Sequence, residues 1–133
     1  MKAPSRPLDN VRLVSIVERQ DALHAGLPST HRPRLVWQRD KTILLLIHLT
    51  GWTYRKVRKL KVSDFPLQVE SLRDLDDGKL DEIKALLHSY LHETRCHLAG
   101  AASGDAMFIK WRGGVLSGEG WRARRLKYVQ MLV

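Results

Sequence analysis

Apolar residues near the start of the chain recur at helical spacing. Val11, Val14 and Val17 lie three residues apart, and this spacing predicts a helix over about 10–23. The stretch 26–33 then holds one glycine and two prolines among small polar residues, which is typical of a break between helices. The pattern therefore predicts an N-terminal helix followed by a linker.

A second predicted helix begins near Val36 and ends at Thr50-Gly51. Its centre is an uninterrupted apolar run at 43–47, so we expect a helix that is buried on most sides. Gly51 suits the left-handed position that often ends a helix. His48 lies in this apolar helix, and we interpret it as a hydrogen-bonded core histidine rather than a metal ligand.

Three further helices follow from the same reasoning. A short helix over about 53–61 would bury Tyr54, Val57 and Leu60 and expose the basic residues between them. The clearest helix runs from about 80 to 98. A last helix opens at Ser117 or Gly118 and continues through Leu132. The apolar face of the helix at 80–98 is broad and contains Ile83, Leu86, Leu87, Tyr90, Leu91, Thr94 and Leu98.

Two stretches suggest extended structure. Weak alternation over 67–78 with a turn signal at Asp76-Asp77-Gly78 predicts a small hairpin, and 107–111 reads as a short strand. We therefore expect a mainly α fold with a small β-hairpin and short strands, an α+β class.

Length and composition narrow the functional classes. The chain has 133 residues, of which 44% are hydrophobic and 28% charged, as expected of one globular domain. The run at 43–47 is far shorter than the roughly 20 residues of a membrane span. The first residues lack the apolar stretch of a secretory signal. Cys96 is the only cysteine, which excludes an internal disulfide. We expect a cytoplasmic protein with no membrane partner.

Charge is the first positive clue to function. Lys and Arg number 23 against 14 acidic residues, a formal net charge of +9. The charge is segregated, because 41–63 holds six basic residues and no acidic one, whereas 64–82 is acidic and 83–133 is again basic. Such a balance favours nucleic acid as the partner, ahead of an acidic protein or a lipid surface.

Three segments resemble the catalytic domain of tyrosine recombinases, the phage-integrase-like enzymes. The first is 39–51, which is similar to that family's buried helix with a Thr-Gly ending. The second is 57–65, in which Leu60, Ser63 and Asp64 match a Leu-x-x-Ser-Asp-hydrophobic ending. The third joins the helix at 83–95 to Gly104-Asp105, the apolar piece after it and the Gly-rich turn at 113–114. The resemblance covers about 34–127, which divides the chain into an N-terminal helix and linker (1–33) and a recombinase-like helical domain (34–133).

The resemblance implies chemistry that this chain does not reproduce. The family cleaves DNA with a tyrosine nucleophile, and arginines, a lysine and histidines surround the phosphate. The first arginine would fall on Thr53, whose hydroxyl cannot replace a guanidinium. Arg55 is two residues further along, about 200° round a helix from position 53, so it is a poor substitute for the missing arginine. The family's second arginine, histidines and nucleophilic tyrosine would all follow the Gly-rich turn, but only one helix is predicted after that turn in this sequence. We therefore expect no catalytic residue and no enzyme activity.

Two local matches to the family motif stand in the wrong place. His92-Glu93-Thr94-Arg95 spells the family's His-x-x-Arg, but it precedes the Gly-rich turn that it should follow. Tyr128 lies on a helix that corresponds to one well before the nucleophile, so we interpret it as a packing or rim residue.

Two other groups of residues invite a binding hypothesis. His88, His92 and Cys96 have metal-ligand spacing on a helix, but nothing nearby completes a tetrahedral shell, and we expect no metal or other cofactor. Trp52, Trp111 and Trp121 lie beside basic residues and would suit base stacking, although core packing is the expected role of at least two of them.

The cations of two predicted helices are the candidate DNA-binding residues. A solvated helix face would explain each run equally simply. So many like charges without acidic neighbours repel one another, however, and phosphates would supply the missing counter-charge. The predicted contacts are Arg55, Lys56, Arg58, Lys59, Lys61, Arg122, Arg124, Arg125 and Lys127.

Three functional hypotheses remain. The first is a non-catalytic, recombinase-related protein that binds duplex DNA mainly through phosphates and regulates integration, excision or transcription of a mobile element. The second is a protein–protein module that docks on a full-length recombinase or self-associates through an apolar surface. The third is a split enzyme that a partner chain completes, with Tyr128 as nucleophile.

Overall fold

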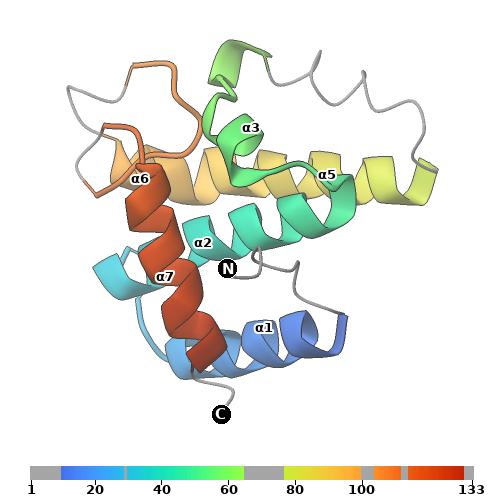
Figure 1. The fold of residues 1–133 in the computed structure, drawn as a ribbon. Coiled ribbons are helices and arrows are strands. Elements are labelled where there is room, and N and C mark those ends of the chain that lie inside the picture. The colour runs from blue at the N-terminus through green and yellow to red at the C-terminus, as the bar shows by residue number, and fades with distance from the viewer. Residues whose placement is uncertain (1–9, 29, 65–76, 100–103, 112–113, 131–133) are drawn as a thin grey trace.

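The computed structural model describes residues 10–28, 30–64, 77–99, 104–111 and 114–130, and the fold is mainly helical (Figure 1). In this part of the chain no strand forms, so the short strand expected at 107–111 is absent. The predicted hairpin at 67–78 lies almost wholly outside the described residues. The elements are α1 (Asn10–His24), α2 (Arg32–Thr50), α3 (Tyr54–Arg58), the 3₁₀ turn η1 (Val62–Asp64), α5 (Asp77–Ser89), the π-helical turn η2 (Tyr90–Arg95), α6 (Cys96–Leu98) and α7 (Gly118–Gln130).

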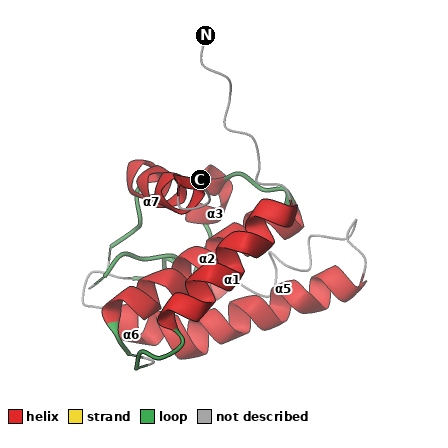
Figure 2. Ribbon diagram, turned by 90° about the horizontal axis from the view of Figure 1, so that it is seen from below, coloured by secondary structure: helices red, strands yellow, loops and turns green. Residues whose placement is uncertain are grey.

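Helix α2 lies at the centre of the molecule. It contacts α1, α3, α5 and η2. Figure 2 shows α3 and α7 together on one side of α2 and α5 on the opposite side. Leu13 and Ile16 of α1 belong to the same hydrophobic core as the α2 side chains, so the N-terminal helix is built into the domain.

The two ends of α2 follow from its sequence. The helix begins at Arg32, earlier than predicted, because Pro33 falls in the first turn, where a missing N–H costs nothing. Gly51 ends the helix in the left-handed conformation, with φ 76°, and its N–H donates to the Ile47 carbonyl at 2.9 Å. The prediction for Gly51 is therefore confirmed.

The prediction that His48 is a core histidine is wrong. Its side chain is exposed, and Leu45, Ile47 and Leu49 beside it are only partly buried. The last turns of α2 are thus covered on one side alone, and an exposed imidazole keeps its hydration. The apolar run at 43–47 concealed this, because an all-round apolar pattern does not say where the covering elements stop.

The long helix predicted at 80–98 is confirmed as α5, η2 and α6 in continuous succession. It begins at Asp77, so the Asp77-Gly78 pair that suggested a turn instead belongs to the first turn of α5. Five members of the predicted apolar face are buried, and Leu86 and Leu91 are half-buried. The buried members are Ile83, Leu87, Tyr90, Thr94 and Leu98.

The segment 104–111 is a loop whose centre, 107–109, is buried, and hydrogen bonds hold it to η2 and to the residues after α3. Met107 N–H donates to the Leu60 carbonyl at 3.0 Å, and the Tyr90 hydroxyl donates to the Met107 carbonyl at 2.8 Å. Isolated β-bridges join Lys61 to Ala106 and Ile109 to Val115. Because the pairing moves to a different partner after each bridge, no ladder long enough for a strand develops.

Candidate nucleic-acid interface

Helix α3 presents its cations to solvent because its apolar stripe is anchored. Val57 and Leu60 are buried, and the Thr53 hydroxyl caps the helix by accepting a hydrogen bond from the Lys56 N–H at 3.3 Å. The stripe expected for 53–61 faces the core, with Tyr54 half-buried, but the helix is shorter than predicted because it ends at Arg58 and Leu60 lies beyond it. Arg58 is half-buried, and the exposed cations are Arg55, Lys56, Lys59 and Lys61.

A cation–π contact fixes one of these charges. The Lys56 ammonium lies 4.5 Å from the centroid of the Trp52 ring, which is half-buried against the core. The Trp52 N–H donates to the Thr50 hydroxyl at 3.1 Å, which holds the backbone at the turn between α2 and α3. The Lys56 side chain is therefore held over the Trp52 ring in a defined orientation.

The start of α7 packs against α3. The Tyr54 and Trp121 rings stack with centroids 5.3 Å apart, and the Tyr54 hydroxyl donates to the Leu116 carbonyl. A Cβ atom built on Gly118 would lie 3.8 Å from Arg58 Nη1, so the guanidinium of α3 reaches the first turn of α7. Burial is the main reason why the pKa of Tyr54 rises to about 12. The two basic helices are neighbours although more than fifty residues separate them in sequence.

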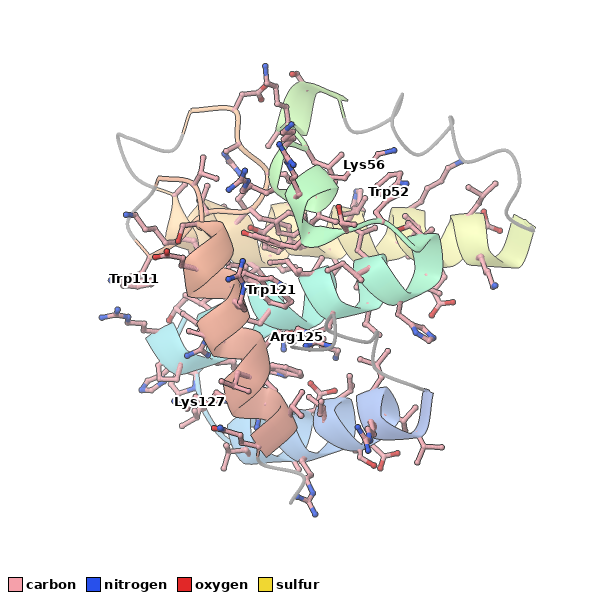
Figure 3. The ribbon with its side chains drawn as sticks, in the orientation of Figure 1. Trp52, Lys56, Trp111, Trp121, Arg125 and Lys127 are labelled. Carbon is pink, nitrogen blue, oxygen red and sulfur yellow. The ribbon has the colours of Figure 1, made fainter. Side chains whose placement is uncertain are left out.

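The cations of α7 divide between the surface and the interior. Arg122 and Lys127 are exposed and Arg125 is half-buried. Helices α3 and α7 form one layer on one side of α2 (Figure 2), and Figure 3 shows Lys56 on α3 and Arg125 and Lys127 on opposite sides of α7. The structure therefore brings both predicted basic sets to one side of α2, with Arg58 closest to the junction between the helices.

Arg124 faces the interior. Its Nε donates to Asp40 Oδ2 at 2.9 Å, and its Nη2 donates to the Tyr128 hydroxyl at 2.8 Å. The Tyr128 hydroxyl in turn donates to the same Asp40 oxygen. Of the nine predicted DNA contacts, Arg124 is the one that the structure engages in these bonds, whereas Arg122 and Lys127 of the same helix are exposed.

Asp40 also binds a second arginine. Arg39 donates to Asp40 Oδ1 from Nε at 3.0 Å and from Nη2 at 2.8 Å, and its Nη1 reaches the Ile109 carbonyl at 3.3 Å. Asp40 is fully buried and Arg39 is 3% exposed. This group was not among the predicted sites, although an adjacent Arg-Asp pair in a mostly apolar helix is a sequence signal for a buried ion pair.

Tyr128 is a packing residue, as its place in the sequence suggested. It is buried, and its ring meets Trp37 edge-to-face with centroids 5.3 Å apart. Burial, together with the adjacent Asp40 carboxylate, raises the pKa of Tyr128 above its usual value. A hydroxyl in this setting resists forming the phenolate that a nucleophile needs.

The His-x-x-Arg match also has a structural role. Arg95 donates to the Ala106 carbonyl from Nε at 3.0 Å and to the Gly104 carbonyl from Nη2 at 3.0 Å. It therefore ties the π-helical turn to the loop that follows. His92, the first residue of the match, is exposed.

The described residues contain no cluster of three or more His, Cys, Asp or Glu side chains that could hold a metal ion. The His88 and His92 rings are in contact, with centroids 4.2 Å apart and planes tilted by 43°, and the Cys96 thiol donates to the His92 carbonyl at 3.2 Å. The helical spacing noted in the sequence thus yields a ring pair and a thiol directed at the backbone.

The three tryptophans beside basic residues all pack against the core, which confirms the prediction for at least two of them. Trp121 is buried, whereas Trp52 and Trp111 are half-buried. Arg32 lies over the Trp111 ring, 5.5 Å from its centroid, so each half-buried ring carries a cation. Base stacking by Trp52 and Trp111 stays a prediction.

No protein-family model, curated protein or solved structure matches the chain. The resemblance to tyrosine recombinases accordingly stays a prediction based on the three segments. Among the described residues, no helix combines the length and the apolar character that crossing a membrane requires.

Proposed function

We propose that this chain is a non-catalytic DNA-binding protein with a recombinase-like helical domain, and that it binds duplex DNA mainly through phosphates. The observation that carries the proposal is the packing of α3 against α7 through Tyr54 and Trp121. This contact places two basic helices from distant stretches of the sequence side by side in one layer. Either helix alone would be explained as an ordinary solvated helix face.

Electrostatics supports a polyanionic ligand. Four cations of α3 and the residues just after it are exposed, as are Arg122 and Lys127 of α7, and the helices α3 and α7 lie together on one side of α2 (Figure 2). Like charges gathered in this way repel one another in the free protein. Phosphates that neutralise them release condensed counterions, and this release makes binding favourable and strongly dependent on salt.

The proposed lack of catalysis has its own support. Thr53 stands at the position of the family's first arginine, and its hydroxyl accepts the hydrogen bond that caps α3. The Tyr128 hydroxyl is buried against Asp40. The family's phosphoryl chemistry would need both an arginine guanidinium at position 53 and an accessible tyrosine phenolate.

Salt-dependent binding to a short fluorescein-labelled duplex tests the proposal. If five or six phosphates are neutralised, the plot of log affinity against log salt concentration should have a slope near about −5. Lys59→Gln, on the proposed face, should make that slope less steep by about 1. Lys84→Gln is the matched control, because Lys84 is exposed on α5 across the molecule. Binding that ignores salt, or equal effects of the two variants, would refute the proposal.

Exposed apolar side chains favour a second candidate, a protein–protein module that self-associates or docks on a full-length recombinase. Val11 and Val14 lie on adjacent turns of α1 and are 76% and 52% exposed, and Leu23 of the same helix is 64% exposed. Val11 and Val14 are three residues apart and share one face of α1, and this exposed apolar pair is the observation that favours an association surface. Light scattering over a concentration series should then detect a dimer that Val11→Ser/Val14→Ser abolishes, whereas a strict monomer that captures no recombinase contradicts this candidate.

A further inference from the structure

A buried ionic group joins three parts of the molecule. It consists of Arg39, Asp40, Arg124 and Tyr128, and we call it the Asp40 hub. Both carboxylate oxygens of Asp40 are used, Oδ1 by Arg39 and Oδ2 by Arg124 and Tyr128. Because Asp40 is fully buried, these groups take the place of its hydration shell.

The hub holds α7 at two points. Arg124 and Tyr128 tie the second half of the helix directly to α2. Arg39 bonds the Ile109 carbonyl, and Ile109 pairs with Val115 just before α7 begins. The carboxylate of Asp40 therefore influences both where α7 starts and how the helix is turned about its axis.

The rotation of α7 decides which of its cations face outward. Arg124 and Tyr128 are four residues apart and share one face of the helix, which is the face toward α2. Arg122, Arg125 and Lys127 occupy the remaining directions. Their mutual repulsion, and their repulsion from the cations of α3, oppose the observed arrangement, and Asp40 is the buried acid that offsets it.

We propose that Asp40 is a positioning residue for the nucleic-acid interface: through Arg124 and Tyr128 it holds α7 so that the outward cations of this helix lie in one layer with those of α3. The inference rests on the proposed function in so far as DNA is the ligand of that layer. It makes a prediction opposite in sign to simple electrostatics. Removing the negative charge of Asp40 should weaken DNA binding, whereas a purely electrostatic role would strengthen it.

Asp40→Asn and Tyr128→Phe test the proposal, with Asp81→Asn as the control. Asp81 is exposed on α5, so its substitution changes the net charge as Asp40→Asn does but leaves the hub intact. We expect Asp40→Asn to bind the labelled duplex about fivefold more weakly than the wild type. Its salt slope should be less steep by about 2, because the α7 cations leave the interface. Asp81→Asn should bind as tightly as the wild type or slightly more tightly.

Tyr128→Phe separates positioning from charge and from misfolding. It keeps the aromatic ring against Trp37 and the net charge, and it removes the hydroxyl between Asp40 and Arg124. We expect about twofold weaker DNA binding with unchanged helix content by circular dichroism. If Asp40→Asn does not fold, this variant decides the question. Wild-type or tighter binding by every folded hub variant overturns the proposal.

Hydrogen exchange without DNA keeps the two proposals distinguishable. In either hub variant, amides of α7 should exchange several-fold faster than in the wild type, while those of α5 keep their rates. If this selective loss of protection appears and the wild type binds no DNA, the hub positions α7 and the proposed function is wrong. If exchange rises equally in α5 and α7, or in neither, the hub does not position α7 and the inference is wrong.

Discussion

Tyr54 and Trp121 stack with their ring centroids 5.3 Å apart, and this contact joins the two basic helices of the molecule. Tyr54 lies in the first turn of α3 and Trp121 in the first turn of α7. Because the pair joins the helices that carry the two sets of cations, its loss should affect stability and the proposed interface together.

Trp121→Ala should lower the free energy of unfolding by about 3–5 kcal/mol, because the side chain is 4% exposed and its removal leaves a large cavity. Urea denaturation followed by far-ultraviolet circular dichroism measures the change. Trp111→Ala is the matched control, since Trp111 is half-buried and should cost distinctly less. Equal losses for the two variants would show that Trp121 is not a core residue.

Gly51→Ala should destabilise the protein by about 1–2 kcal/mol. Nothing lies within 4 Å of a Cβ built on Gly51, so the cost comes from the left-handed backbone, with φ 76°, and not from a clash. Gly26→Ala provides the comparison, because its site is equally open and has no such φ. Thermal melts of both variants check this, and a Gly51→Ala protein as stable as Gly26→Ala would contradict the left-handed ending of α2.

The pH dependence of stability should contain a contribution from His24. Burial lowers the pKa of His24 below its usual 6.5, and the nearby basic side chains His31, Arg34 and Arg124 lower it further, against the opposing effect of Asp21. The folded state thus holds the proton less tightly than the unfolded state does. The resulting stability is complete above pH 6.5 and is lost as the pH falls from there through the folded pKa.

His24→Gln should flatten that part of the profile, because the amide does not titrate. Unfolding free energies between neutral and mildly acid pH, measured by urea titration, make the comparison. The exposed His88→Gln serves as the control. A His24→Gln protein that loses stability on acidification as steeply as the wild type would exclude His24 as the group responsible.

Local patterns predicted most of the helices because a helix is a short-range structure. Val57 of α3, and Ile83 and Leu87 of α5, are buried as their spacing required. The failures arise from contacts between elements. The strand expected at 107–111 needs a partner ladder that no nearby residue supplies, and the exposure of His48 depends on where the elements that cover α2 end.

The Asp40 hub could not be predicted in the same way. Asp40 and Arg124 are 84 residues apart, and Arg124 stands in a run of cations that gives no sign which member turns inward. Buried charge is expensive unless it is paired, so only the packing of α7 on α2 selects the partner. The sequence thus predicted which residues form the candidate interface. It did not predict which of those cations face solvent and which face the interior.

The amino-acid sequence by itself determined where the helices form, which of their faces are apolar, and that positive charge is concentrated in two blocks. Hydrophobic periodicity and composition are properties of neighbouring residues, so they can be read without coordinates. Tertiary structure alone decided that α3 and α7 lie side by side, that Arg124 binds Asp40, and that Tyr128 is buried. These relationships join residues far apart along the chain, and their energies exist only once packing has excluded water from between them.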